Sequence, residues 1–168
     1  MTVRPDSPRS ALLALALCAF AYLYAFPYYP KINNPNENVR FYMTAALVER
    51  GEYNIDSLRQ RWGRVNDAAS YRGRLYSVKA PGTSLLGVPA YAAYLWAADR
   101  LDLRFDRART LWLCRLTATI LPVLLFLFFF WRWLGSRARH PELRDAVFVS
   151  VALGSAFYGY GLLFVSHA

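Results

Sequence analysis

Apolar residues fall in four long runs along this 168-residue chain, with polar segments between them. The runs cover residues 11–26, 84–98, 111–131 and 146–165. A water-soluble core would instead repeat its apolar positions at the period of a helix or a strand. The pattern therefore predicts an all-α polytopic membrane protein. Its single membrane domain, residues 1–168, would contain transmembrane helices at 10–28, 82–98, 110–133 and 145–165.

The long polar stretch, residues 30–80, is the part large enough for chemistry outside the membrane. Asn34 suits a helix N-cap, Pro35 suits the first helical position, and Glu37 completes a capping box. This predicts an amphipathic surface helix that ends at Arg50-Gly51. A short hairpin is predicted further on, with its turn at Arg72-Gly73 and apolar or aromatic residues suited to strands on both sides.

The distribution of basic residues leaves two topologies open. Arg4 and Arg9 favour a cytoplasmic N-terminus, which places loop 30–80 outside the cytoplasm. The basic connection 132–144 also belongs on the cytoplasmic side, but four full spans would place it outside. A non-spanning segment 84–98, with Pro89 in its middle, would remove this conflict. The chain end has neither a helix cap nor a basic terminus, so we expect an N-terminal part of a longer protein.

The net charge of +9 does not indicate a nucleic-acid partner, because the arginines crowd the ends of the apolar runs. Membrane lipids are the partners that this arrangement predicts. Cys18 and Cys114 both lie inside apolar runs and behave as small hydrophobic residues. The sequence has no cluster with metal-ligand spacing, no phosphate-binding glycine loop and no nucleophile elbow, so we expect neither a cofactor nor a structural metal. A divalent ion held by Glu37 and Asp67 has no support in the sequence.

Several features occur together in one order. An acidic residue follows the first apolar run, then come a helix, Gly51, the run from Asp67 to Tyr76-Ser77-Val78-Lys79-Ala80-Pro81-Gly82, and a terminal Phe-Val-Ser-His-Ala. This order resembles that of bacterial members of the GT-C superfamily, the polytopic glycosyltransferases that use polyprenyl-phosphate-linked sugars and include protein O-mannosyltransferases and aminoarabinose transferases. The resemblance covers nearly the whole chain.

The resemblance implies an inverting glycosyltransferase in the bacterial inner membrane, multi-pass, with its first loop extracytoplasmic. Its partners would be a polyprenyl-phosphate-sugar donor and an acceptor glycan, lipid or protein. The family has Asp-Glu in the first outer loop where this chain has Asn36-Glu37, so the resemblance implies Glu37 as the catalytic base, with Asp67 as the second candidate. Lys79 matches a family lysine and implies contact with the donor phosphate. The remaining candidates are Arg72 and Arg74 for the phosphate, and Asn36, Tyr76 and His167.

The chemistry of this reaction needs few groups. The sugar already has a phosphate leaving group, so one carboxylate must accept the acceptor's proton and one or two cations must stabilise the departing phosphate. The alternative interpretation is a non-catalytic membrane subunit or a truncated remnant of such an enzyme. In that case Glu37 only caps a helix and Lys79 only anchors the chain at the membrane surface.

Overall fold

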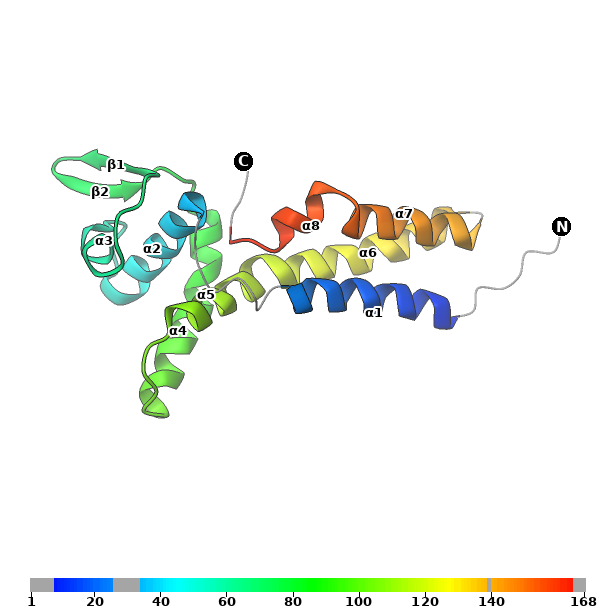
Figure 1. Cartoon of the computed structure of the whole chain (residues 1–168), viewed down its shortest axis with the longest axis horizontal. Coiled ribbons are helices and arrows are strands. Elements are labelled where there is room, and N and C mark those ends of the chain that lie inside the picture. The colour runs from blue at the N-terminus through cyan, green and yellow to red at the C-terminus, as the bar shows by residue number, and fades with distance from the viewer. Residues whose placement is uncertain (1–7, 26–33, 139, 165–168) are drawn as a thin grey trace. The chain divides into compact units, whose positions relative to one another are not determined.

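The computed structural model describes residues 8–25, 34–138 and 140–164 (Figure 1). The chain forms two compact units, and each is described by itself. The described parts of Met1–Pro27 and Ile120–Leu162 make one unit, and those of Tyr28–Thr119 and Leu163–Ala168 make the other. The second unit, called here the loop unit, contains almost all the candidate site residues.

Helix α2 (Pro35–Arg50) is the centre of the loop unit, and local signals set both of its ends. Asn34 is the N-cap, and its side chain accepts a hydrogen bond from the Asn36 N–H at 3.0 Å. Gly51 ends the helix in the left-handed region, with φ 69°, where a glycine has no steric penalty. The predicted helix is therefore present, with Asn34 and Gly51 at its ends as predicted, but it is largely buried inside its unit.

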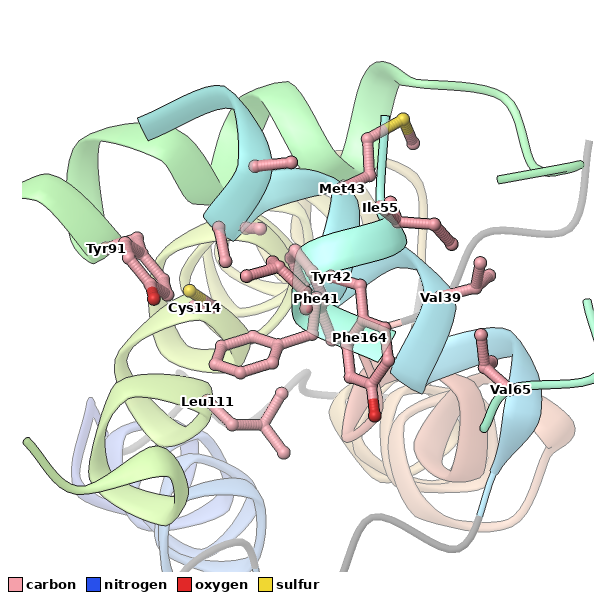
Figure 2. Packing of buried hydrophobic residues seen from close by; sticks show 14 of the residues in the cluster. Val39, Phe41, Tyr42, Met43, Ile55, Val65, Tyr91, Leu111, Cys114 and Phe164 are labelled. Atoms are coloured by element: carbon pink, nitrogen blue, oxygen red, sulfur yellow. The ribbon is translucent and has the colours of Figure 1, made fainter. Parts of the chain in front are cut away.

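Most of the loop unit's core lies around α2. Short helix α3 (Asp56–Trp62), helix α4 (Gly82–Arg100) and helix α5 (Arg107–Arg115) all contribute side chains to it. Figure 2 shows side chains of this core and labels Val39, Phe41, Tyr42, Met43, Ile55, Val65, Tyr91, Leu111, Cys114 and Phe164.

The predicted hairpin is confirmed as strands β1 (Ala68–Tyr71) and β2 (Arg74–Ser77), which pair antiparallel. Arg72 and Gly73 form the turn with φ values of 51° and 77°, and positive φ at both central residues is the type I′ geometry that fits the twist of a hairpin. The Asp56 carboxylate accepts from the Leu75 N–H at 3.2 Å, and the Ile55 N–H donates to the Leu75 carbonyl at 2.9 Å. These two bonds attach the hairpin to the start of α3.

Helix α4 packs closely against α2. The Ser84 hydroxyl donates to the Arg40 carbonyl at 3.1 Å, and the Thr44 hydroxyl lies 3.0 Å from the Ser84 carbonyl. A Cβ at Gly87 would force its neighbours to shift, since it would lie 2.7 Å from the Phe164 ring and 3.3 Å from the Thr44 methyl group on α2. The small residues of α4 therefore let the two helices approach each other.

The other unit consists of α1 (Pro8–Ala25), α6 (Leu121–Arg137), α7 (Pro141–Leu153) and α8 (Ala156–Gly161). Figure 1 shows α1, α6 and α7 running side by side. The Tyr22 hydroxyl donates to the Ala152 carbonyl at 2.9 Å and so joins α1 to α7. An apolar cavity of about 350 Å³ lies among these three helices. Large apolar side chains cover much of the outer surface, among them Leu12, Leu17, Phe20, Leu125, Phe126 and Phe129.

The prediction of a polytopic all-α membrane protein is wrong for the part of the chain that the structure describes. Only one helix there is long and apolar enough to cross a membrane, by length and composition. It is Arg107–Arg137, 31 residues formed by α5, the π-helical segment η2 (Leu116–Ile120) and α6. A two-stranded sheet is also present, so the fold is not purely helical.

At the other three predicted spans, the described helices do not reach the combined length and apolarity of a membrane span. The apolar part of α1 is Leu12–Tyr24, and the predicted end of that span, 26–28, lies outside the described residues. Helix α4 is not apolar enough and contains Pro89. The run 146–165 is divided at Gly154-Ser155 into α7 and α8, and the 13 residues of α7 rise only about 20 Å, whereas a bilayer core is about 30 Å thick.

Candidate functional site

The Glu37 carboxylate is fully engaged inside the loop unit. Its side chain is 1% exposed and accepts from Arg115 through two bonds, Nε to Oε1 at 2.7 Å and an Nη to Oε2 at 2.6 Å. The Phe164 N–H donates to Oε1 at 2.8 Å. The two arginine bonds form a bidentate fork, the strongest geometry for this kind of ion pair.

This geometry gives Glu37 a structural role. The predicted capping box is wrong, because the carboxylate bonds to Arg115 and Phe164 and the N-cap bond is made by Asn34 to Asn36. An acceptor hydroxyl could reach this carboxylate only if the buried ion pair opened. Breaking such a pair leaves an uncompensated buried charge at a cost of about 3–5 kcal/mol.

Asn36, the residue before Glu37 on the same helix, positions Arg40 one turn further along. Its side-chain oxygen accepts from Arg40 Nε at 3.0 Å, and Arg40 Nη1 donates to the Ala80 carbonyl at 2.8 Å. Arg40 is 2% exposed, and this burial lowers the pKa of its guanidinium, while the nearby charge of Asp67 acts in the opposite direction. Arg40 therefore fixes the chain just before α4 and lies in the field of Asp67.

Asp67 and Lys79, predicted as a base and as a phosphate-binding cation, form an ion pair with each other. Lys79 Nζ lies 3.2 Å from Asp67 Oδ2, and the two side chains are 28% and 30% exposed. The backbone supports the pair, because the Val78 N–H donates to the Asp67 carbonyl at 3.1 Å and the Lys79 N–H donates to the Ser77 hydroxyl at 3.1 Å. In contrast to Glu37, both charges can be reached from outside.

The pair lies just before the N-terminus of α4. Pro81 is the N-cap of this helix, and no side chain caps it. Gly82, the first residue of the helix, is exposed. Backbone N–H groups at a helix start carry partial positive charge and favour an anion. Asp67, Lys79 and the exposed helix start at Pro81-Gly82 therefore form the accessible polar cluster that we take as the candidate site, while Thr83 and Ser84 of the first turn are buried.

The hairpin arginines do not join this cluster. Arg72 lies at the turn, with its guanidinium over the Tyr71 ring at 5.2 Å, and Arg74 pairs with Glu52 at 3.8 Å. Ser77 is the fourth residue after the turn, a length of about 13 Å along the strand. Tyr76 is half-buried on β2 opposite Ala69. His167 lies outside the described residues.

Two arginines that organise the site were missed by the sequence interpretation. Arg115 lies inside the apolar run 111–131, and Arg40 lies on the predicted surface helix. A basic residue within an apolar run needs an acidic partner, so Arg115 was a sequence signal for a buried ion pair. Its position could have indicated that one carboxylate of the polar loop is buried.

The described residues contain no group of three or more histidine, cysteine or acidic side chains that could hold a metal ion. Glu37 and Asp67, the two carboxylates considered for a divalent ion, each have a cationic partner instead. Comparison with known proteins adds no assignment, because no family model, curated protein or solved structure matches the chain.

Proposed function

We propose that the chain binds a polyprenyl-phosphate-linked sugar and contributes to its transfer by inversion onto an extracytoplasmic acceptor. The observation that carries the proposal is the accessible Asp67–Lys79 pair beside the uncapped start of α4. The order of residues that resembles the GT-C glycosyltransferases supports the same chemistry. Helix Arg107–Arg137 would cross the inner membrane and keep the site near the lipid-borne donor.

In this proposal Lys79 and the N–H groups at the start of α4 bind the donor phosphate. Lys79 is already paired, so a phosphate that binds it draws the cation away from Asp67 and leaves that carboxylate free to accept a proton. The acceptor oxygen then attacks the anomeric carbon, the bond from that carbon to the phosphate oxygen breaks, and the electron pair leaves with the phosphate. The acceptor's proton moves to Asp67.

Donor binding is the first test. Polyprenyl phosphate is titrated against the folded chain in detergent micelles, and Lys79→Met is expected to weaken binding about 10- to 150-fold, the equivalent of one hydrogen bond to a charged group. Arg50→Met is the matched control, because Arg50 also pairs with a carboxylate in the same unit, at 2.8 Å from Glu52. Equal affinity in Lys79→Met and the unsubstituted chain would reject the phosphate site.

The base is tested separately. Asp67→Asn removes the proton acceptor but keeps the shape of the side chain, so transfer should fall about a hundredfold or more while donor binding persists. Glu52→Gln serves as the control carboxylate in the same unit. Normal transfer by Asp67→Asn would remove Asp67 from the reaction.

A non-catalytic membrane subunit is the second candidate function. The burial of Glu37 favours it, because the carboxylate in the family's base position holds the fold together instead. This candidate predicts that the chain binds no donor phosphate, and that Lys79→Met changes only membrane insertion or expression.

A further inference from the structure

The outward face of α4 is a continuous apolar stripe. Leu85, Leu86, Pro89, Ala93 and Trp96 are all exposed, and their spacing of three to four residues places them on one side of the helix. Leu86 is 59% exposed and Trp96 is 64% exposed. The stripe continues beyond the helix end, where Leu101 is 66% exposed.

The opposite face of the same helix is buried within the loop unit. Ser84, Gly87, Ala90 and Tyr91 pack toward α2 and α5, and Ala98 is also buried. Helix α4 is therefore apolar on both faces, but its own unit covers only one of them. A surface helix in water would be polar on its outer side.

Helix α4 also lies against the beginning of the candidate membrane span. The Cys114 thiol donates to the Gly87 carbonyl, with 3.7 Å between sulfur and oxygen, and Cys114 belongs to α5, the first segment of Arg107–Arg137. Figure 1 shows α4 running across α5. The link from α4 to α5 is only Leu101–Asp106, which spans at most about 20 Å. The stripe therefore lies close to the end of the helix proposed to cross the bilayer.

The residues at the end of the stripe are typical of a membrane surface. The Arg100 guanidinium lies 5.4 Å from the centre of the Trp96 ring. Tryptophan is enriched at the headgroup level, and arginine can keep its charge in water while its stem lies against apolar surface. Asp99 and Asp102 balance the charges of Arg100 and Arg104, so binding here would depend on apolar burial and not on anionic lipid.

We infer that α4 is an interfacial helix whose stripe, Leu85 to Trp96, inserts into the boundary between headgroups and acyl chains of a phospholipid bilayer. The occupant of the apolar face is thus lipid. This inference rests on the membrane location in the proposed function. It goes further by identifying the α4 stripe as the surface of the loop unit that contacts the bilayer and so keeps the donor site there.

The inference is tested with nitroxide labels on single added cysteines in the full chain, reconstituted in phosphatidylcholine bilayers. Leu86→Cys and Ala93→Cys place labels on the stripe. Ser70→Cys on the exposed hairpin is the water-facing control, and Phe129→Cys on α6 reports whether the candidate span is in lipid. Cys18 and Cys114 are buried, so the unsubstituted chain gives the labelling background.

Collisions with oxygen, which partitions into lipid, are compared with collisions with a water-soluble nickel chelate. We expect both stripe labels to behave like Phe129→Cys, with high oxygen and low nickel accessibility, and Ser70→Cys to show the reverse. Stripe labels open to nickel would overturn the inference, and so would labels shielded from both reagents, which would mean that protein covers the stripe. If the label at Phe129→Cys is also open to nickel, the proposed membrane span has failed as well, so the two failures are distinguishable.

Discussion

The ion pair between Glu37 and Arg115 gives the largest predicted effect on stability. Arg115→Met removes the two bonds at 2.7 and 2.6 Å and leaves a carboxylate that is 1% exposed with only the Phe164 N–H as donor. An uncompensated buried charge costs about 3–5 kcal/mol, a large part of the 5–15 kcal/mol by which a typical domain is stable. We therefore expect Arg115→Met to unfold the loop unit or to lower its unfolding free energy by that amount.

The reciprocal change, Glu37→Gln, removes the negative charge that faces the Arg115 guanidinium, whose side chain is 4% exposed, and should cost about the same 3–5 kcal/mol. The double variant Glu37→Gln/Arg115→Met lacks both charges of the pair, and the glutamine oxygen can still accept from the Phe164 N–H. We expect it to be more stable than either single variant. If the losses of unfolding free energy in the two single variants sum to about 6–10 kcal/mol and the double variant loses less than about 3 kcal/mol, the coupling energy between the two residues exceeds about 3 kcal/mol.

Chemical unfolding in detergent micelles, followed by circular dichroism, measures these differences. Arg109→Met is the matched control, because it makes the same substitution on the same helix in an exposed pair with Asp106, and its cost should stay below about 1 kcal/mol. A Glu37→Gln protein as stable as the unsubstituted chain would refute the reasoning. A double variant whose cost equals the sum of the singles would refute it equally.

Two further predictions concern the packing and the ionisation of α4. Gly87→Ala should cost about 1–3 kcal/mol in unfolding free energy, since its Cβ would lie 2.7 Å from the Phe164 ring, whereas Gly135→Ala has open space on α6 and should stabilise by up to about 1 kcal/mol. Burial, followed by the hydrogen bond to Glu49, raises the pKa of the Tyr91 hydroxyl above its ordinary value near 10. The neutral phenol therefore stabilises the fold below about pH 10, and this contribution is lost as the pH rises further. In Tyr91→Phe the alkaline loss measured in unfolding titrations should shrink, and an unchanged profile would contradict the assignment.

The sequence predicted correctly those elements whose ends are set by residues close to them in the chain. Asn34, Pro35 and Gly51 act within a few residues of the helix ends that they set, and α2 begins and ends as they indicate. Arg72-Gly73 likewise determines its own turn and therefore the hairpin register. The ion-pair partner of a charged side chain could not be predicted in this way. Arg115 is separated from Glu37 by 78 residues, and no short sequence pattern contains both.

The runs of apolar residues predicted where helices lie but not how far each one extends. A run is an average over many positions, so it does not register a break that two residues make. Gly154-Ser155 divides the last run, since the Ser155 side chain accepts from the Phe157 N–H and starts a new helix. Among the described helices, only Arg107–Arg137 is both long enough and apolar enough to cross a membrane.

Two of the acid–base pairs of the loop unit, Asp67–Lys79 and Glu37–Arg115, differ in the free energy that a ligand must supply to separate them. An exposed pair such as Asp67–Lys79 contributes at most about 1 kcal/mol, so a phosphate that takes Lys79 from Asp67 meets little resistance. A ligand at Glu37 would have to separate it from Arg115 at about 3–5 kcal/mol and would also need a path into a site that is 1% exposed. Of these two pairs, Asp67–Lys79 is therefore the one that a ligand can reach and separate at low cost, while Glu37–Arg115 joins α2 to α5 inside the unit.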